Sequence, residues 1–225
     1  MNFSRSFALV RAVAAGLAFV LGASTALRAA NSAPAITAFD QAFAAVNDYT
    51  AILHVHEAKG DQTQDRVYQY QFMKPHYAKT LILDGDSKGS GAVWAGGDQV
   101  SGHQGGILSG FHRTVSVDDP RAVSLRGVTI PQGLLQRIVE NYATISGKLT
   151  QTDGGKIGGI PTDRLELKVA DPAANGGVTE QILYLSKETH WPIRQVMYAG
   201  SQIVLDETVT DFKTNVGLKE SDFPF

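Results

Sequence analysis

The feature that most constrains the fold is a strict two-residue alternation of apolar and charged side chains. Residues 164–169 read Arg-Leu-Glu-Leu-Lys-Val, so one face of this segment is apolar and the other is charged. Such alternation is typical of a β-strand with one buried and one solvated face, which is common in antiparallel sheets. The sequence therefore predicts an antiparallel sheet whose two faces differ in polarity.

Further strand candidates lie on both sides of this segment, with short turns between them. We expect strands at residues 49–57, 66–74, 77–83, 179–186, 193–199 and 202–212, and two short strands within 89–100. The turns are rich in glycine and polar residues, as in Lys59-Gly60-Asp61, Gly96-Gly97-Asp98 and Gly200-Ser201. These spacings favour a meander of hairpins. Residues 101–120 show no clear period and are expected to be irregular.

Two segments carry apolar side chains at helical spacing. Pro34–Val46 has its apolar stripe at Ile36, Phe39, Phe43 and Val46. Pro131–Tyr142 has a broad apolar face formed by Leu134, Leu135, Ile138, Val139 and Tyr142. Spacings of three and four residues predict amphipathic helices, and proline is favoured in a first turn. The predicted fold class is therefore α+β.

The first thirty residues have the pattern of a secretory signal. Arg5 and Arg11 supply positive charge, the run from Phe7 to Leu21 is mostly apolar, and small residues follow at 22–26. We therefore predict a signal peptide at residues 1–30 and one mature domain at residues 31–225, located in the periplasm. The alternative is an uncleaved membrane anchor, which Arg11 disfavours because it interrupts the apolar run.

Composition excludes several classes of protein. The 225 residues include no cysteine, which excludes a disulfide framework, a thiol enzyme and a cysteine-ligated metal site. The 20 basic and 22 acidic residues give a formal charge of −2, which argues against nucleic acid as a partner. Removing residues 1–30 takes away three arginines and no acid, so the mature charge becomes −5.

The sequence contains few candidates for catalytic or metal chemistry. His54 and His56 share one face of a predicted strand and could bind a metal if His76 or His103 supplied a third ligand. A solvated strand face is the favoured interpretation. Asp118 and Asp119 precede a proline, which is ordinary turn chemistry. The glycine clusters lack the order of a phosphate-binding loop, so they are interpreted as turns. We predict no cofactor, no metal site and no enzymatic activity.

The predicted strands carry enough apolar side chains to cover one whole face of a sheet. The candidate residues for this face are Tyr68, Tyr70, Phe72, Trp94, Leu165, Leu167, Leu183, Leu185 and Met197. Two helices can bury such a face completely, and it is then a packed core. If the sheet is too curved for them to fill, an apolar cavity remains.

The order of short motifs resembles that of the periplasmic lipoprotein-carrier superfamily typified by LolA and LolB, and a related family of unknown function. Residues 70–75, Tyr-Gln-Phe-Met-Lys-Pro, look like the carriers' aromatic strand, and Val93-Trp94 looks like their tryptophan strand. Residues 182–193 are similar to their turn of the form Lys-x-Thr followed by x-Pro. Residues 209–215, followed by Phe223-Pro224, resemble the carriers' final strand and tail.

This resemblance implies an incurved antiparallel half-barrel with helices covering its concave face. It implies a monomeric, non-enzymatic carrier that binds a lipid or an acylated protein and exchanges it with a membrane-bound donor or acceptor. The nine strand residues would line the cargo cavity, and Leu134, Leu135, Ile138 and Val139 would form a helical lid. The first alternative is an envelope interaction module without cargo. The second is a metal enzyme that uses His54 and His56.

Overall fold

A sheet of eleven antiparallel strands dominates residues 33–224, which are the residues that the computed structural model describes. Two α-helices accompany it in this part of the chain, α1 (Pro34–Ala44) and α2 (Leu135–Thr144). The first helix agrees with the apolar stripe that predicted it. The predicted signal peptide lies outside the described residues.

The strands follow one another along the chain in two meanders. The first meander contains β1 (Asp48–Lys59), β2 (Gln62–Met73), β3 (Tyr77–Gly85), β4 (Gly91–Trp94), β5 (Gln99–His103) and β6 (His112–Ser116). The second contains β7 (Gly147–Ile157), β8 (Ile160–Val169), β9 (Glu180–Ser186), β10 (Pro192–Ala199) and β11 (Gln202–Thr214). Single 3-10 turns lie at Gly106–Leu108, Ala173–Asn175 and Glu220–Asp222.

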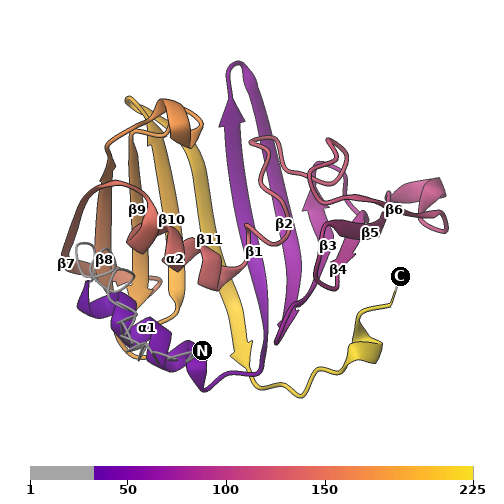
Figure 1. Ribbon diagram of the computed structural model, residues 1–225, viewed down its shortest axis with the longest axis horizontal. Helices are drawn as coiled ribbons and strands as arrows, with labels where there is room; N and C mark the ends of the chain where they lie inside the picture. The colour runs from indigo at the N-terminus through magenta and orange to yellow at the C-terminus, as the bar shows by residue number, and fades with distance from the viewer. Residues whose placement is uncertain (1–32, 225) are drawn as a thin grey trace, which may run out of the picture.

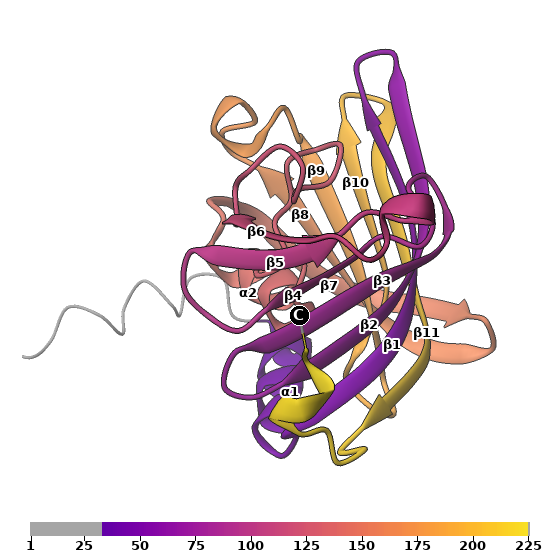
Figure 2. The same cartoon turned by 90° about the vertical axis from the view of Figure 1, so that its right-hand side faces the viewer.

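The two meanders join at the centre of the sheet, where β1 pairs with β11. The strand order is β6-β5-β4-β3-β2-β1-β11-β10-β9-β8-β7, so β6 and β7 are the two edges and the sheet does not close. This open antiparallel sheet agrees with the predicted half-barrel. Figures 1 and 2 show that it bends, so that β4–β6 stand at an angle to β7–β11.

The strand order has one consequence for the connection between β6 and β7. These strands lie at opposite edges, so residues 117–146 must cross a face of the sheet to join them. Figure 1 shows this connection passing in front of the sheet, with α2 near its end. Both helices lie on this same side (Figure 1).

Aromatic side chains fill the space between α1 and the sheet. Phe39 of α1 meets Trp191 edge to face, with ring centroids 5.2 Å apart. Phe43 of α1 lies 6.3 Å from Phe72 of β2, and Trp191 lies 4.5 Å from Phe212 of β11, both between ring centroids. Buried aromatic pairs of this kind add roughly 0.5–1.5 kcal/mol beyond the area they bury. The N-terminal helix is therefore held by both meanders.

Helix α2 is held by burial and by Tyr49. Leu135, Val139 and Tyr142 are at most 1% exposed. The Tyr49 hydroxyl accepts a hydrogen bond from the Leu135 backbone N–H and donates one to the Gln136 side chain, both at 3.2 Å. This hydroxyl satisfies a donor in the first turn of the helix, where Leu134 at the N-cap provides no side-chain cap.

The opposite face of the sheet is charged, as the alternation at residues 164–169 predicts. Arg194 donates from Nε to Asp206 at 2.8 Å on neighbouring strands, and Lys168 lies 3.2 Å from Glu166. Within the described residues, no helix is both long enough and apolar enough to span a membrane.

Three segments differ from the sequence-based expectations. The edge strands β6 and β7 were not expected, because residues 101–120 were interpreted as irregular and residues 147–157 gave no strand signal. Helix α2 begins at Leu135 and not at Pro131. The Gly133 N–H bonds to the Thr129 and Ile130 carbonyls in a separate turn, which ends the irregular segment before the helix starts.

Candidate functional site

A cavity of about 1220 Å³ lies between the sheet and the connection from β6 to β7. Its walls come from strands of both meanders, from residues 121–133 of the connection, and from Arg137, Ile138 and Asn141 of α2. Pockets for small molecules measure about 300–1,000 Å³, so this cavity can hold a long ligand. Its position follows from the strand order, since the connection has to cross the bent sheet.

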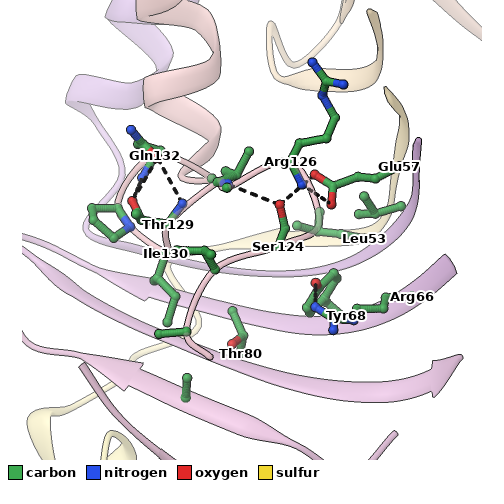
Figure 3. Close-up of a pocket in the computed structure, with 18 of the residues that line it drawn as sticks. Leu53, Glu57, Arg66, Tyr68, Thr80, Ser124, Arg126, Thr129, Ile130 and Gln132 are labelled. Atoms are coloured by element: carbon green, nitrogen blue, oxygen red, sulfur yellow. Dashed lines mark hydrogen bonds between the residues drawn. The ribbon is translucent and has the colours of Figure 1, made fainter. Parts of the chain in front are cut away.

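Most of the strand surface that faces the cavity is apolar. The apolar lining comes from β1, β3, β5 and the connection and includes Leu53, Val55, Ile82, Val100 and Ile130. Figure 3 shows Leu53 and Tyr68 on the strands and Ile130 on the connection around this space. Such a lining is suited to an apolar ligand or ligand segment.

A band of four polar side chains interrupts this apolar lining and is called the polar band here. It crosses four adjacent strands, with Glu57 on β1, Glu207 on β11, Gln195 on β10 and Gln181 on β9, and all four residues line the cavity. They are only 3–9% exposed. Gln195 is the register partner of Glu207. Glu57 is opposite Leu205 and Gln181 is opposite Met197, so these two residues lie diagonally to Glu207 and Gln195. Directly opposite side chains lie about 5 Å apart at Cβ and diagonal ones about 7–8 Å, so the four polar side chains form a staggered row.

Residues of the cavity lining carry buried polar atoms without a hydrogen-bond partner. Among residues 33–224, Gln181 Oε1 and the hydroxyl of Tyr70 are such atoms. An unsatisfied buried polar group costs roughly 1–3 kcal/mol. Water or a bound ligand would have to satisfy these atoms, which marks this part of the cavity as a place for a polar group.

Glu57 ties the connection to the sheet. The Ser124 hydroxyl donates to its carboxylate at 2.7 Å, and the Arg126 backbone N–H donates at 3.4 Å (Figure 3). The Leu125 N–H donates to Gln64 Oε1 at 3.2 Å, and the Arg126 guanidinium donates to the Ala58 carbonyl at 2.9 Å. The end of the β1–β2 hairpin therefore holds residues 124–126 by hydrogen bonds.

Glu207 has the most perturbed carboxyl group of the site. Burial, and secondarily the negative charge of Glu57, raise the pKa of Glu207 from its ordinary value of 4.5 to about 7. Burial also raises the pKa of Tyr68 and holds the pKa of Tyr70 well above its usual range. The site therefore contains an acid that changes its charge near neutral pH, surrounded by hydroxyl and amide groups.

Arginines surround the cavity, and most of them already have partners. The five arginines of the lining are Arg66, Arg113, Arg121, Arg126 and Arg137. Arg66 donates to the Asp86 carbonyl and the Tyr68 hydroxyl, Arg121 pairs with Asp119, and Arg137 pairs with Glu140. In the part of the chain that the structure describes, only Arg113 of the five shows no such partner.

The structure divides the predicted cargo and lid residues between the cavity and the core. Tyr68, Tyr70 and Met197, together with Ile138 from the lid set, line the cavity. The remaining ones, which do not line it, are Phe72, Trp94, Leu165, Leu167, Leu183, Leu185, Leu134, Leu135 and Val139. All of these belong to the buried cluster or pack against it. Their roles in cargo binding and in a lid remain predictions.

Of the other candidate residues, His103 lines the cavity, whereas His54, His56, His76, Asp118 and Asp119 do not. His56 contacts Asp65 at 2.8 Å and His54 contacts Thr210 at 3.3 Å. A group of three or more metal-ligating residue types close enough to hold a metal ion is absent from residues 33–224. Asp119 is engaged with Arg121, which holds the pKa of its carboxyl at about 2. These residues have local structural partners.

Sequence reasoning did not single out the polar band. The sequence does contain a signal, because Tyr49, Ala51, Leu53 and Val55 alternate along one strand face and the same period continues to Glu57. Likewise Glu207 lies between the inward-facing residues Leu205 and Val209. An acid in phase with an apolar strand face is the pattern that would have identified both.

Comparison with known proteins finds likeness in fold alone. No family model matches the chain, and no curated protein sequence matches it. Among solved structures, an uncharacterized conserved protein from Thermus thermophilus aligns with a TM-score of 0.55 and 12% identity, over 84% of this chain and 90% of that one. The chain therefore has the fold of that protein.

Three further solved structures are similar at lower scores. A putative outer membrane lipoprotein-sorting protein domain from Vibrio parahaemolyticus aligns with a TM-score of 0.45 and 14% identity, over 84% of this chain and 95% of that one. The MucA/MucB complex of Pseudomonas aeruginosa gives 0.47 and 12%, with 86% of this chain but only 61% of the other covered. A LolA superfamily protein from Nitrosomonas europaea aligns with a TM-score of 0.38 and 13% identity, over 86% of this chain and 99% of that one.

Proposed function

We propose that this protein is a non-enzymatic periplasmic carrier that binds a lipid, or the acyl chain of a lipoprotein, in the cavity between the sheet and residues 117–146. The observation that carries this proposal is the cavity itself, about 1220 Å³ in volume with a largely apolar lining. Burying an alkyl chain there contributes about 0.8 kcal/mol per CH₂ group. The sequence resemblance to lipoprotein carriers supports the same function.

The cavity is partly open to solvent, and the segment before α2 is the part of its wall that can move at the lowest energetic cost. Lifting α2 would expose Leu135, Val139 and Tyr142, each of which is at most 1% exposed. Exposing a buried side chain of this size costs about 1.5–3 kcal/mol. Residues 117–134 are mostly exposed or half-buried and are held at Glu57 and Gln64 by hydrogen bonds. We therefore propose that this segment opens first and that α2 forms the inner wall.

The test is uptake of an environment-sensitive fluorescent fatty acid by the mature protein, combined with mass spectrometry of lipid extracted from it. Thr80→Phe places a ring in the cavity, because Thr80 lies on its lining. We expect this variant to lose affinity by about tenfold or more. Leu83→Phe is the matched control, since Leu83 lies on the same strand, is 38% exposed and does not line the cavity.

The outcome that would reject the carrier function is clear. If the folded protein takes up no fluorescent fatty acid and no lipid is found in its extract, the cavity has another use. If both phenylalanine variants bind equally well, the ligand lies elsewhere on the protein.

One observation favours the alternative of an envelope interaction module. Ile107 and Phe111, in the loop between β5 and β6, are 99% and 71% exposed. Apolar side chains that are exposed to this degree close together are a common feature of sites of protein contact. A photo-crosslinker at position 107 that gives one defined protein adduct in cells, in a protein that takes up no lipid, would favour the module over the carrier.

A further inference from the structure

We propose that the polar band binds the polar end of an amphiphile and selects a ligand whose end donates hydrogen bonds, an amine or a hydroxyl. This inference rests on the proposed carrier function and specifies its ligand. The apolar part of the ligand would extend from the band along Tyr68, Ile82 and Ile130, all of which line the cavity.

The polar band lies inside the cavity and not at its rim. Glu57, Gln181 and Gln195 are 3% exposed and Glu207 is 9% exposed, yet all four line the cavity. A bare alkyl chain placed against them would remove water from these groups and return no hydrogen bond, at a cost of roughly 1–3 kcal/mol per group. A purely apolar occupant is therefore disfavoured at this position.

The charge and the hydrogen-bonding atoms of the band decide which polar end it can bind. Gln181 Oε1 is an acceptor without a donor among residues 33–224, and the carboxyl group of Glu207 lines the same cavity. Glu57 already accepts from Ser124, but its negative charge acts on Glu207. The four band residues include two carboxyl groups and no cation, so the band carries negative charge above the pKa of Glu207. A carboxylate or phosphate would be repelled there, whereas a donor would be bound.

The arginines around the cavity are not the main site for the polar end. Four of the five are engaged with carbonyl, hydroxyl or carboxylate groups, whose contacts an anionic group would have to replace. The fifth, Arg113, lies on the edge strand β6, which four strands separate from β1 and the polar band. Within residues 33–224, Gln181 and Tyr70 of the lining carry buried atoms without a partner.

The experiment compares three ligands with alkyl chains of equal length that end in an amine, an alcohol or a carboxylic acid. Each displaces a bound fluorescent probe from the mature protein, at a pH above the pKa of Glu207 and below the micelle-forming concentration. We expect the amine and the alcohol each to bind at least about tenfold more tightly than the acid. Equal binding of all three, or tighter binding of the acid, would overturn the inference.

A substitution separates the two kinds of donor. Glu207→Gln removes the negative charge but keeps hydrogen-bonding groups of similar shape. The amine should then lose affinity by about tenfold, whereas the alcohol should bind nearly as before. Glu188→Gln is the matched control, because Glu188 is exposed in the turn between β9 and β10 and does not line the cavity. An amine affinity unchanged by Glu207→Gln would contradict a role of this carboxylate.

Failure of this inference can be distinguished from failure of the carrier function. If none of the three ligands displaces the probe and the probe itself does not bind, the carrier function fails. If all three displace it equally, the carrier function stands and the polar band is a site for water only.

Discussion

Glu207 lies where its strand otherwise presents apolar side chains to the interior. Leu205 and Val209, two residues before and after it, are 6% and 7% exposed. A charged carboxylate at such a position is costly unless it is paired, so the folded protein favours the protonated form. A residue of this kind reduces stability in return for a property of the site, and binding of a polar ligand end is the property we propose.

The raised pKa of Glu207 gives a prediction for stability against pH. The folded protein binds this proton more tightly, with a pKa of about 7 against 4.5 for the ordinary group. Near pH 4 both states are protonated and the group has no effect. As the pH rises from about 4.5 to about 7, the unfolded state loses this proton before the folded state does, so the free energy of unfolding falls by up to about 3 kcal/mol and then levels off. Glu207→Gln should remove this loss.

Urea unfolding of the wild type and of Glu207→Gln, at roughly pH 5 and roughly pH 8, measures this effect. The variant should gain stability relative to the wild type at the higher pH and little at the lower one. Comparison of the two proteins cancels the contributions of other titrating groups. A stability difference that does not change with pH would show that Glu207 is not protonated in the fold near neutral pH.

At the scale of single elements, the connection from β6 to β7 differs from the strands that it joins. Its residues are mostly exposed or half-buried, and backbone and side-chain hydrogen bonds fix it to the β1–β2 hairpin. Segments with few buried apolar contacts open locally at low free-energy cost. Residues 121–133, which we call the roof of the cavity, are therefore expected to be the part of its wall that opens most readily.

Ser124→Ala tests this expectation. The substitution removes the hydroxyl that donates to Glu57 at 2.7 Å and accepts from the Val128 N–H at 3.2 Å. It should cost about 1–3 kcal/mol, because the buried Glu57 carboxylate loses a partner. The backbone amides of residues 125–128 should exchange hydrogen faster, and a bound fluorescent fatty acid should dissociate faster.

The control for this substitution is Ser116→Ala, in an exposed serine at the end of β6 whose hydroxyl bonds only to nearby exposed groups. It should leave exchange at residues 125–128 and ligand dissociation unchanged. If Ser124→Ala also leaves them unchanged, Glu57 does not hold the roof closed.

The strands that carry a strong alternation could be predicted from the sequence, and the weak edge strands could not. In β7 the inward-facing Gln151 accepts a hydrogen bond from the Ala35 N–H at the start of α1, so a polar residue stands where the pattern requires an apolar one. Gly154 in β7 also lacks a side chain because a Cβ there would lie 2.4 Å from Thr162 Oγ1. Contacts with other segments of the chain, and not the strand pattern, therefore explain why these positions hold glutamine and glycine.

The site was predictable to a similar extent. An apolar face with Tyr68, Tyr70 and Met197 followed from alternation and lines the cavity. Which apolar residues remain open and which are covered depends on the path of residues 117–146, and that path follows from strand order and not from any local motif. The position of β6 and β7 at opposite edges had to be known first.

At the scale of the whole molecule, two meanders meet along the β1–β11 ladder and share one core. α1 belongs to the N-terminal half of the chain but packs on Trp191, and Tyr49 of β1 bonds to the first turn of α2. We therefore expect the fold not to depend on the covalent continuity of the connection. The cavity should depend on it, because residues 121–133 form part of the cavity wall.

A single cut in the connection therefore separates fold from ligand retention. We consider a protease recognition site inserted between Gly127 and Val128, which are both exposed. After cleavage, the fragments should remain associated through the β1–β11 ladder and the shared aromatic contacts, as judged by native mass spectrometry and circular dichroism. The bound fluorescent fatty acid should be released faster, because the segment before α2 is then no longer connected through the chain to the anchored residues 124–126. Separation of the fragments would mean that the covalent link holds the two meanders together, and unchanged release would mean that the ligand leaves by a route that does not involve the connection.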